Sequence, residues 1–232
     1  MPVKLLIFDL DGTLIDTLAD ITNSINYAFG RHGLKKTLTE RQVRGMVGEG
    51  IARLMEKAAA AGKVGGGKKL TEELTGDFLA HYRRHLLDNT RVYPGVTETL
   101  RKLAGFKKAI ITNKRVSLSK KILKGLDLAG QFDLVVGPET AGAGKPSPEP
   151  VFYVLRKLKA APGEAVMIGD SRLDIESGRN AGIKCTVAVT YGYGNNRGSL
   201  KGADYVIDSM EDLLATLYRN EPMLDRRADP RI

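Results

Sequence analysis

Short, continuous apolar runs recur along this chain, and the spacing between them leaves room for helices. They lie at residues 5–8, 109–111, 134–136, 166–168 and 186–189. Because polar residues do not alternate with apolar ones inside these runs, they predict strands buried on both faces, as in a parallel sheet covered by helices. We therefore predict an α/β fold with a doubly wound, Rossmann-like parallel sheet as its core.

The first two apolar runs are separated by far more residues than a crossover helix needs, which indicates an inserted domain. Apolar residues recur at helical spacing within the gap, at Leu18, Ile21, Ile25 and Phe29 and again at Leu74, Phe78, Tyr82 and Leu86. We expect residues 1–15 and 91–219 to form an α/β catalytic core and residues 16–90 to form a small helical cap domain. Residues 220–232 lack apolar periodicity and are predicted to be a flexible tail.

Local signals mark the ends of some helices. Thr39 and Gln42 fit a capping box at a helix start. Gly182 follows the apolar periodicity that begins near Arg172 and is suited to close that helix. Residues 62–69, with the sequence GKVGGGKK, contain too much glycine to hold a helix and predict a flexible loop in the cap.

The chain is basic, with 36 Lys and Arg against 27 Asp and Glu and a formal net charge of +9. Clustered cations interleaved with aromatic residues would indicate a nucleic-acid partner. Here the basic residues are spread in short groups such as Lys35-Lys36 and Lys68-Lys69, which is typical of solvated faces. Nucleic acid is therefore not expected as a partner, whereas a positive field suits a small anionic substrate.

Neither a membrane nor an oxidising compartment is indicated by the sequence. No apolar run approaches the length of about 20 residues that a membrane helix needs, and the N-terminal segment turns acidic too early for a signal peptide. The single cysteine, Cys185, permits no internal disulfide and lies in an apolar setting that predicts a buried thiol. We expect a cytoplasmic protein that does not bind membranes.

The strongest local motif is Asp9-Leu10-Asp11-Gly12-Thr13, which directly follows the first apolar run. Two carboxylates two residues apart at a strand end can reach one ligand if the backbone turns sharply, as Gly12 permits. Asp9 could attack phosphorus to form an acyl phosphate, and Asp11 could protonate the leaving oxygen and later deprotonate a water. A solvated Asp-Gly turn is the alternative explanation of the isolated motif.

Three further segments follow other strands or loops that reach the same sheet edge. Thr112 and Asn113 could hydrogen-bond phosphate oxygens, and Lys145 could neutralise charge during phosphoryl transfer. Asp170 and Asp174 add two carboxylates at a helix start. Each segment alone has an ordinary explanation, as a strand-to-turn transition, a surface lysine or a helix cap.

Together the segments place Asp9, Asp11, Asp170 and Asp174 at one edge, where their charges would repel strongly without a cation. A hard divalent ion satisfies oxygen ligands of this kind, and Mg²⁺ completes its octahedral shell readily with substrate phosphate. The sequence has no His or Cys cluster of the kind that binds zinc. Mg²⁺ is therefore the expected cofactor.

These four segments, in this order, resemble the signature of the haloacid dehalogenase superfamily of phosphatases. In that pattern Asp9 matches the nucleophile, Asp11 the general acid and base, Thr112 the phosphate-binding hydroxyl residue, Lys145 the stabilising lysine and Asp170 the metal-binding acid. The resemblance implies a metal held by the Asp9 side chain, the Asp11 main-chain carbonyl and the Asp170 side chain, with Asp174 as a second acid at the metal site.

The helical insert resembles the small cap of the phosphoglycolate phosphatase and phosphoglucomutase branch. Residues 44–50 resemble the substrate-facing loop of those enzymes, and residues 191–194 resemble a loop common in phosphoglycolate phosphatases. The expected substrate-binding residues are accordingly Arg44, Thr112, Asn113 and Lys145. A solvated helix end is the alternative explanation of Arg44.

The resemblance implies a Mg²⁺-dependent phosphomonoester hydrolase that acts through an aspartyl-phosphate on a small phosphorylated metabolite, with 2-phosphoglycolate as the preferred substrate. Pyrophosphate, nucleoside monophosphates and sugar phosphates stay open as alternatives, as does a mutase of the phosphoglucomutase type, which uses the same residues and excludes water. Dehalogenation is not expected, because it has no leaving oxygen for Asp11 to protonate. A basic binding protein without activity is the remaining alternative, against which the complete four-part pattern argues. The chain is expected to be a monomer or a homodimer.

Overall fold

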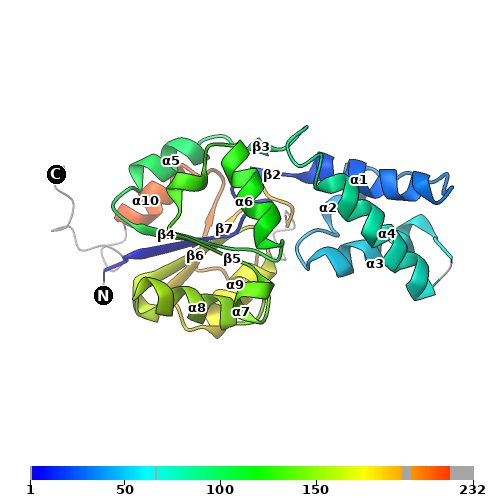
Figure 1. The fold of residues 1–232 in the computed structure, drawn as a ribbon. Coiled ribbons are helices and arrows are strands. Elements are labelled where there is room, and N and C mark those ends of the chain that lie inside the picture. Colours follow the sequence, from blue (N-terminus) through cyan, green and yellow to red (C-terminus); the bar gives the residue numbers. More distant parts are fainter. Residues whose placement is uncertain (1, 66, 195–199, 220–232) are drawn as a thin grey trace.

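The computed structural model describes residues 2–65, 67–194 and 200–219, and its centre is a six-stranded parallel sheet (Figure 1). The strand order is β5-β4-β1-β6-β7-β8. The strands are β1 Leu5–Phe8, β4 Lys107–Ile111, β5 Leu134–Val136, β6 Ala165–Gly169, β7 Cys185–Val189 and β8 Tyr205–Ile207. The predicted doubly wound α/β fold is confirmed, and all five predicted strands are present. The sequence analysis missed β8, a three-residue edge strand whose central residue, Val206, is 54% exposed.

Helices cover both faces of the sheet because its central strands present apolar side chains to each side. In β1, Leu6 and Phe8 belong to one buried cluster while Leu5 and Ile7 belong to another. The first cluster is covered by α5 Val96–Lys102, α6 Val116–Gly125 and α10 Asp212–Arg219. On the opposite face lie α7 Pro138–Ala141, α8 Glu149–Leu158 and α9 Arg172–Asn180 (Figure 1). The loops of this core also contain two 3-10 turns, at Ala129–Gln131 and Pro162–Glu164.

Four further helices lie to one side of the sheet (Figure 1). They are α1 Leu18–Arg31, α2 Glu40–Arg44, α3 Ile51–Gly62 and α4 Gly67–Tyr82. The capping box at α2 is confirmed, since Gln42 N donates to Thr39 Oγ1 and Thr39 N donates to Gln42 Oε1. The predicted apolar stripes of α1 and α4 are buried and face each other.

Two details of the predicted cap differ from the structure. Leu86 was predicted to lie on the same helix face as Leu74, but α4 ends at Tyr82. Leu86 lies after the end of this helix, and its side chain is buried there. The glycine-rich segment 62–69 is not wholly a loop, because Gly62 ends α3 and residues 67–69 begin α4. Lys68, Lys69 and Leu70 favour a helix, which explains why α4 begins as early as Gly67. Residue 66 and the predicted tail, 220–232, lie outside the described residues.

The chain crosses between the sheet and the four helices through a two-stranded ribbon. Strand β2, Ile15–Asp16, pairs antiparallel with β3, Arg91–Val92. The buried carboxylate of Asp20 in α1 accepts hydrogen bonds from the backbone N–H groups of Asn89 and Thr90, which ties the two crossings together. We propose this ribbon as the boundary between core and cap.

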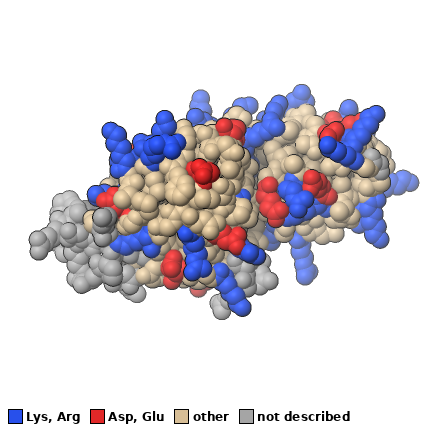
Figure 2. All heavy atoms as spheres, turned by 90° about the horizontal axis from the view of Figure 1, so that it is seen from below, with Lys and Arg blue, Asp and Glu red and all other residues tan. Residues whose placement is uncertain are grey.

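The surface and the single thiol agree with the composition. Figure 2 shows lysine and arginine scattered over the visible face of both parts of the molecule, with no single basic patch. Cys185 is buried, so the predicted buried thiol is confirmed, and burial raises the pKa of this thiol to about 12. Within the described ranges, no helix is both long enough and apolar enough to cross a bilayer.

Candidate active site

The predicted site residues meet at the carboxyl edge of the sheet because β4, β1 and β6 are neighbours. Asp9 follows β1, Thr112 follows β4 and Asp170 follows β6. The chain turns sharply after Asp9, where Gly12 has φ of +90°, a conformation that residues with a side chain rarely adopt. A methyl group at Gly12 would also overlap the Asp170 carboxylate, so glycine allows these two segments to approach.

Three acidic side chains form a buried cluster at this edge. One carboxylate oxygen from each of Asp9, Asp170 and Asp174 lies within 4.8 Å of the other two. Burial, together with the neighbouring carboxylates, raises the pKa of Asp9 well above its ordinary value despite the opposing effect of Lys145. Burial and the charge of Asp174 likewise raise the pKa of Asp170 to about 6. Crowded hard oxygen ligands of this kind fit a divalent cation.

Lys145 is the cation inside this cluster. Its Nζ lies 2.6 Å from Asp9 Oδ1 and 2.5 Å from Asp174 Oδ1. Although burial acts to lower it, the charges of Asp174 and Asp9 raise the pKa of Lys145 above its ordinary value. The other oxygen of Asp174 accepts hydrogen bonds from Ser171 N and Oγ, which caps α9. Asp174 thus holds the lysine beside Asp9, and its predicted metal role stays a prediction.

The Asp11 carboxylate lies outside the acidic cluster. Its Oδ1 accepts hydrogen bonds from Thr17 Oγ1 at 2.6 Å and from Lys114 Nζ at 2.5 Å. A metal role for Asp11 therefore depends on its main-chain carbonyl, as the sequence analysis expected. The position of its side chain, apart from the cluster, suits a proton donor and acceptor.

Sequence analysis missed Lys114, which is buried and also donates to the Tyr82 hydroxyl of the cap at 2.9 Å. Burial acts to lower the pKa of Lys114, but the charge of Asp11 raises it above its ordinary value. The one sequence signal for a role of Lys114 was its position directly after Thr112-Asn113, at the end of a predicted strand. A lone lysine there is ordinarily on the surface, so composition and spacing gave no reason to select it.

Asn113 and Thr112 are held differently. The Asn113 amide donates to the Gly48 carbonyl of the cap at 2.8 Å and to the Lys145 carbonyl at 2.9 Å, and its oxygen accepts from Lys145 N at 2.8 Å. Both of its N–H donors therefore have protein partners. Thr112 Oγ1 accepts from Lys114 N at 3.1 Å, which leaves its hydroxyl hydrogen to donate to a phosphate oxygen.

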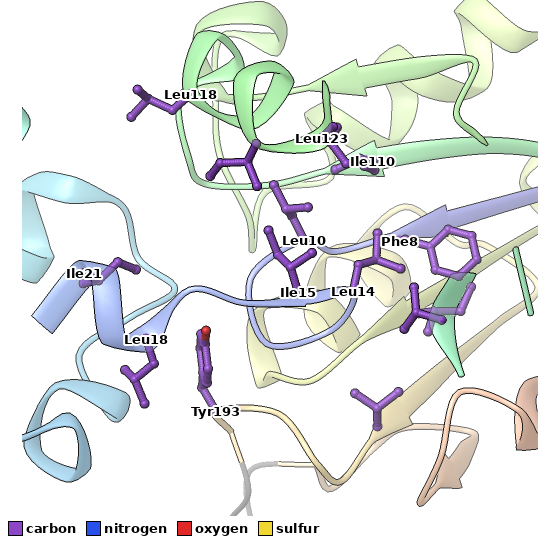
Figure 3. Packing of buried hydrophobic residues seen from close by; sticks show 14 of the residues in the cluster. Phe8, Leu10, Leu14, Ile15, Leu18, Ile21, Ile110, Leu118, Leu123 and Tyr193 are labelled. Atoms are coloured by element: carbon purple, nitrogen blue, oxygen red, sulfur yellow. The ribbon is translucent and has the colours of Figure 1, made fainter. Parts of the chain in front are cut away.

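Arg44 and the loop after β7 close another side of the site. Arg44 Nη1 donates to the Gly192 carbonyl at 3.1 Å, and its guanidinium lies 5.7 Å from the centroid of the Tyr193 ring. Tyr193 N donates to Asp170 Oδ2, and the Tyr193 hydroxyl donates to Asp16. Figure 3 shows this tyrosine rising from its loop toward the chain between Ile15 and Leu18. The sequence analysis noted this loop without assigning Tyr193 a contact.

One cavity collects most of these groups. Of the predicted site residues, Asp9, Asp11, Arg44, Thr112, Asn113, Lys145 and Asp170 line it, together with Lys114 and Tyr193. Asp174 does not line the cavity but forms an ion pair with Lys145, which does. Its remaining wall is apolar and comes largely from the cap, with Ile21, Val47, Ile51, Leu54 and Phe78. The charged floor belongs to the core, so the cavity lies where cap and core meet.

The Asn113 contacts give a testable prediction. We expect Asn113→Ala to lower kcat by about 10- to 100-fold, because small misplacements of a catalytic group such as Lys145 cost rates of that order. Steady-state kinetics would measure this loss, with Asn26→Ala as the matched control. Asn26 makes the same kind of clamp on the backbone of Leu38, at 2.9 and 2.7 Å, entirely within the cap. An equal loss of kcat in both variants would contradict a specific role for Asn113.

Comparisons with known proteins agree with this geometry. A sequence profile described as haloacid dehalogenase-like hydrolase matches residues 6–188. The chain is 37% identical to a phosphoglycolate phosphatase of Aquifex aeolicus, over 82% of this chain and 86% of the relative. It is 35% identical to an N-acetylmuramic acid 6-phosphate phosphatase of Pseudomonas aeruginosa, over 94% and 96% respectively. A crystal structure of a predicted phosphoglycolate phosphatase from Haemophilus somnus superposes with a TM-score of 0.86 at 30% identity, covering 92% of this chain and 97% of that one.

Proposed function

The chain belongs to the haloacid dehalogenase-like hydrolase family and is a phosphatase, and from this premise we propose that it hydrolyses 2-phosphoglycolate to glycolate and phosphate with Mg²⁺. The observation that carries the proposal is the ion-paired set of Asp9, Lys145 and Asp174 beside the separate carboxylate of Asp11. Asp9 is thus a buried nucleophile that is ion-paired with Lys145. Asp11 is a second carboxylate that lies outside this ion-paired set.

In the first proposed step, an Asp9 carboxylate oxygen attacks phosphorus and forms an aspartyl-phosphate. The bond between phosphorus and the ester oxygen breaks, and Asp11 gives its proton to that oxygen as glycolate leaves. Lys145 stabilises the charge on the transferring group, and the Thr112 hydroxyl donates to one of its oxygens.

In the second proposed step, Asp11 takes a proton from a water, whose oxygen attacks phosphorus. The bond between phosphorus and Asp9 breaks, so that Asp9 is regenerated and inorganic phosphate is released. Asp11 ends the cycle protonated, as it began, because the proton from water replaces the one that left with glycolate.

Asp9, Asp170 and the Asp11 main-chain carbonyl would hold the metal ion, with Asp174 close by. The fit rests on the cluster itself, whose three crowded carboxylates carry more negative charge than Lys145 offsets. When bound, Mg²⁺ neutralises carboxylate and phosphate charge and orients the phosphoryl group.

A second candidate substrate is a larger phosphorylated sugar such as N-acetylmuramic acid 6-phosphate. The observation in its favour is the apolar wall that Ile51, Leu54 and Phe78 of the cap present to the cavity. Glycolate would leave much of that wall without contact, whereas a sugar with apolar substituents would cover it.

Phosphate release from a panel of esters, with Mg²⁺ or EDTA, tests the substrate. The panel holds 2-phosphoglycolate, N-acetylmuramic acid 6-phosphate, pyrophosphate, nucleoside monophosphates and sugar phosphates, compared by kcat/KM. We expect 2-phosphoglycolate to lead and EDTA to abolish release. A lead for any other ester would reject the proposed substrate and keep the phosphatase, whereas activity in EDTA would reject the metal.

A further inference from the structure

Lys114 is a buried cation at the active-site cavity that the proposed reaction steps do not use. It lies on the segment between β4 and α6, and its side chain is 7% exposed. Burying a charge is costly unless it is paired, and here the pairing comes from Asp11 and the Tyr82 hydroxyl. An ammonium group has three N–H bonds. Among the described residues, the two recorded partners of Lys114 Nζ leave one N–H for another acceptor.

The place of Lys114 beside Asp11 decides which part of a substrate it can reach. Asp11 protonates the ester oxygen of the substrate in the proposed mechanism. In 2-phosphoglycolate one methylene carbon joins that oxygen to the carboxylate, so a cation in contact with Asp11 lies beside the carboxylate as well. Within the described site, Lys145 is instead occupied with Asp9 and Asp174.

We propose that Lys114 binds the carboxylate of the leaving group and so selects phosphomonoesters that carry a carboxylate on the same carbon as the ester oxygen. This inference rests on the proposed function and deepens it by naming the group that recognises the substrate. The Tyr82 hydroxyl, which holds Lys114 from the cap, positions the ammonium for that contact. Such a cation favours entry of the carboxylate into the cavity, because an unpaired carboxylate is costly to bury.

Arg44 is a third cation among the described residues that line the cavity, beside Lys114 and Lys145, and its contacts argue for a different role. Its guanidinium donates to the Gly192 carbonyl and lies over the ring of Tyr193. The backbone N–H groups of Tyr193 and Gly194 donate to Asp170 Oδ2. The loop after β7 thus holds Arg44, whereas Lys114 contacts the proton donor Asp11 directly. The leaving group is on the side of the proton donor.

Two substrates separate this role from a general effect on Asp11. Ethyl phosphate replaces the carboxylate of 2-phosphoglycolate with a methyl group. We would measure kcat/KM for both esters in the wild type, Lys114→Gln, Lys114→Arg and the control Lys120→Gln, which removes an exposed charge from α6. The quantity compared is selectivity, the kcat/KM for 2-phosphoglycolate divided by that for ethyl phosphate. Loss of folded enzyme lowers both rates equally and cancels, so a destabilised variant still gives a valid selectivity.

We expect Lys114→Gln to lower selectivity by about 10- to 100-fold, the range for a hydrogen bond between charged groups. Lys114→Arg keeps the cation and should retain most of the selectivity, and Lys120→Gln should retain all of it. An equal fall for both esters in Lys114→Gln, or no fall for either, would overturn the inference. If the wild type itself shows no preference for 2-phosphoglycolate, or hydrolyses neither ester, the proposed function fails first, and the wild-type data alone reveal it.

Discussion

Asp9→Asn is expected to lower kcat for phosphate release by at least about 10⁴-fold, because removing a nucleophile costs an enzyme of this kind a factor of that order or more. The amide keeps the shape of the side chain but cannot form the aspartyl-phosphate. It also removes a negative charge beside Lys145, which lies 2.6 Å away. Initial-rate kinetics with 2-phosphoglycolate and Mg²⁺ measure the loss.

The matched control for this variant is Asp88→Asn, which makes the same chemical change at a cap residue whose side chain is 55% exposed. It should leave kcat within about twofold of the wild type, as surface substitutions generally have small effects. Asp9→Asn activity above one hundredth of the wild-type rate, from a preparation free of wild-type enzyme, would mean that Asp9 is not the nucleophile.

Asp170→Asn is expected to lower kcat/KM by about 10³-fold, since a catalytic metal contributes several kcal/mol to stabilising the transition state. A second readout does not depend on activity. Wild-type Tm should rise as Mg²⁺ is added, because an ion that binds only the folded protein stabilises it. The Tm of Asp170→Asn should stay nearly flat over the same Mg²⁺ range.

In EDTA the same variant should be at least as stable as the wild type. Burial and the charge of Asp174 raise the pKa of Asp170 to about 6, so folding at neutral pH is opposed by the ionised carboxylate. An asparagine there removes the charge and still accepts the N–H groups of Tyr193 and Gly194. A large fall in Tm in EDTA would show that Asp170 has a structural role instead, and an undiminished Mg²⁺ response would exclude it as a ligand.

The central elements were predictable because burial fixes their pattern. The apolar runs at Leu5–Phe8 and Ala165–Gly169 have no exposed face, so continuous hydrophobic residues identify them as central strands. Polar groups that follow such strands must meet at one edge of a parallel sheet. Asp9, Thr112 and Asp170 could therefore be brought together from the sequence alone.

The partners of those groups could not be predicted, because they depend on three-dimensional contacts within the core and between the core and the cap. Lys114 is paired with Asp11 across 103 residues and with Tyr82 across 32. Asn113 was predicted to contact substrate, which stays a prediction, and its amide donates to the carbonyls of Gly48 and Lys145. Neither spacing nor composition distinguishes a surface lysine or a turn asparagine from residues with partners of this kind.

The most direct test of the account is to trap the covalent intermediate. Wild-type enzyme would be mixed with 2-phosphoglycolate and Mg²⁺, quenched in acid within one turnover and digested, and the peptide that carries Asp9 would be analysed by mass spectrometry. The proposed aspartyl-phosphate mechanism predicts a phosphoryl group on Asp9 that is absent in EDTA and absent from Asp9→Asn. Phosphate release at the full wild-type rate with no phosphoryl group on Asp9, or with one on another residue, would contradict it.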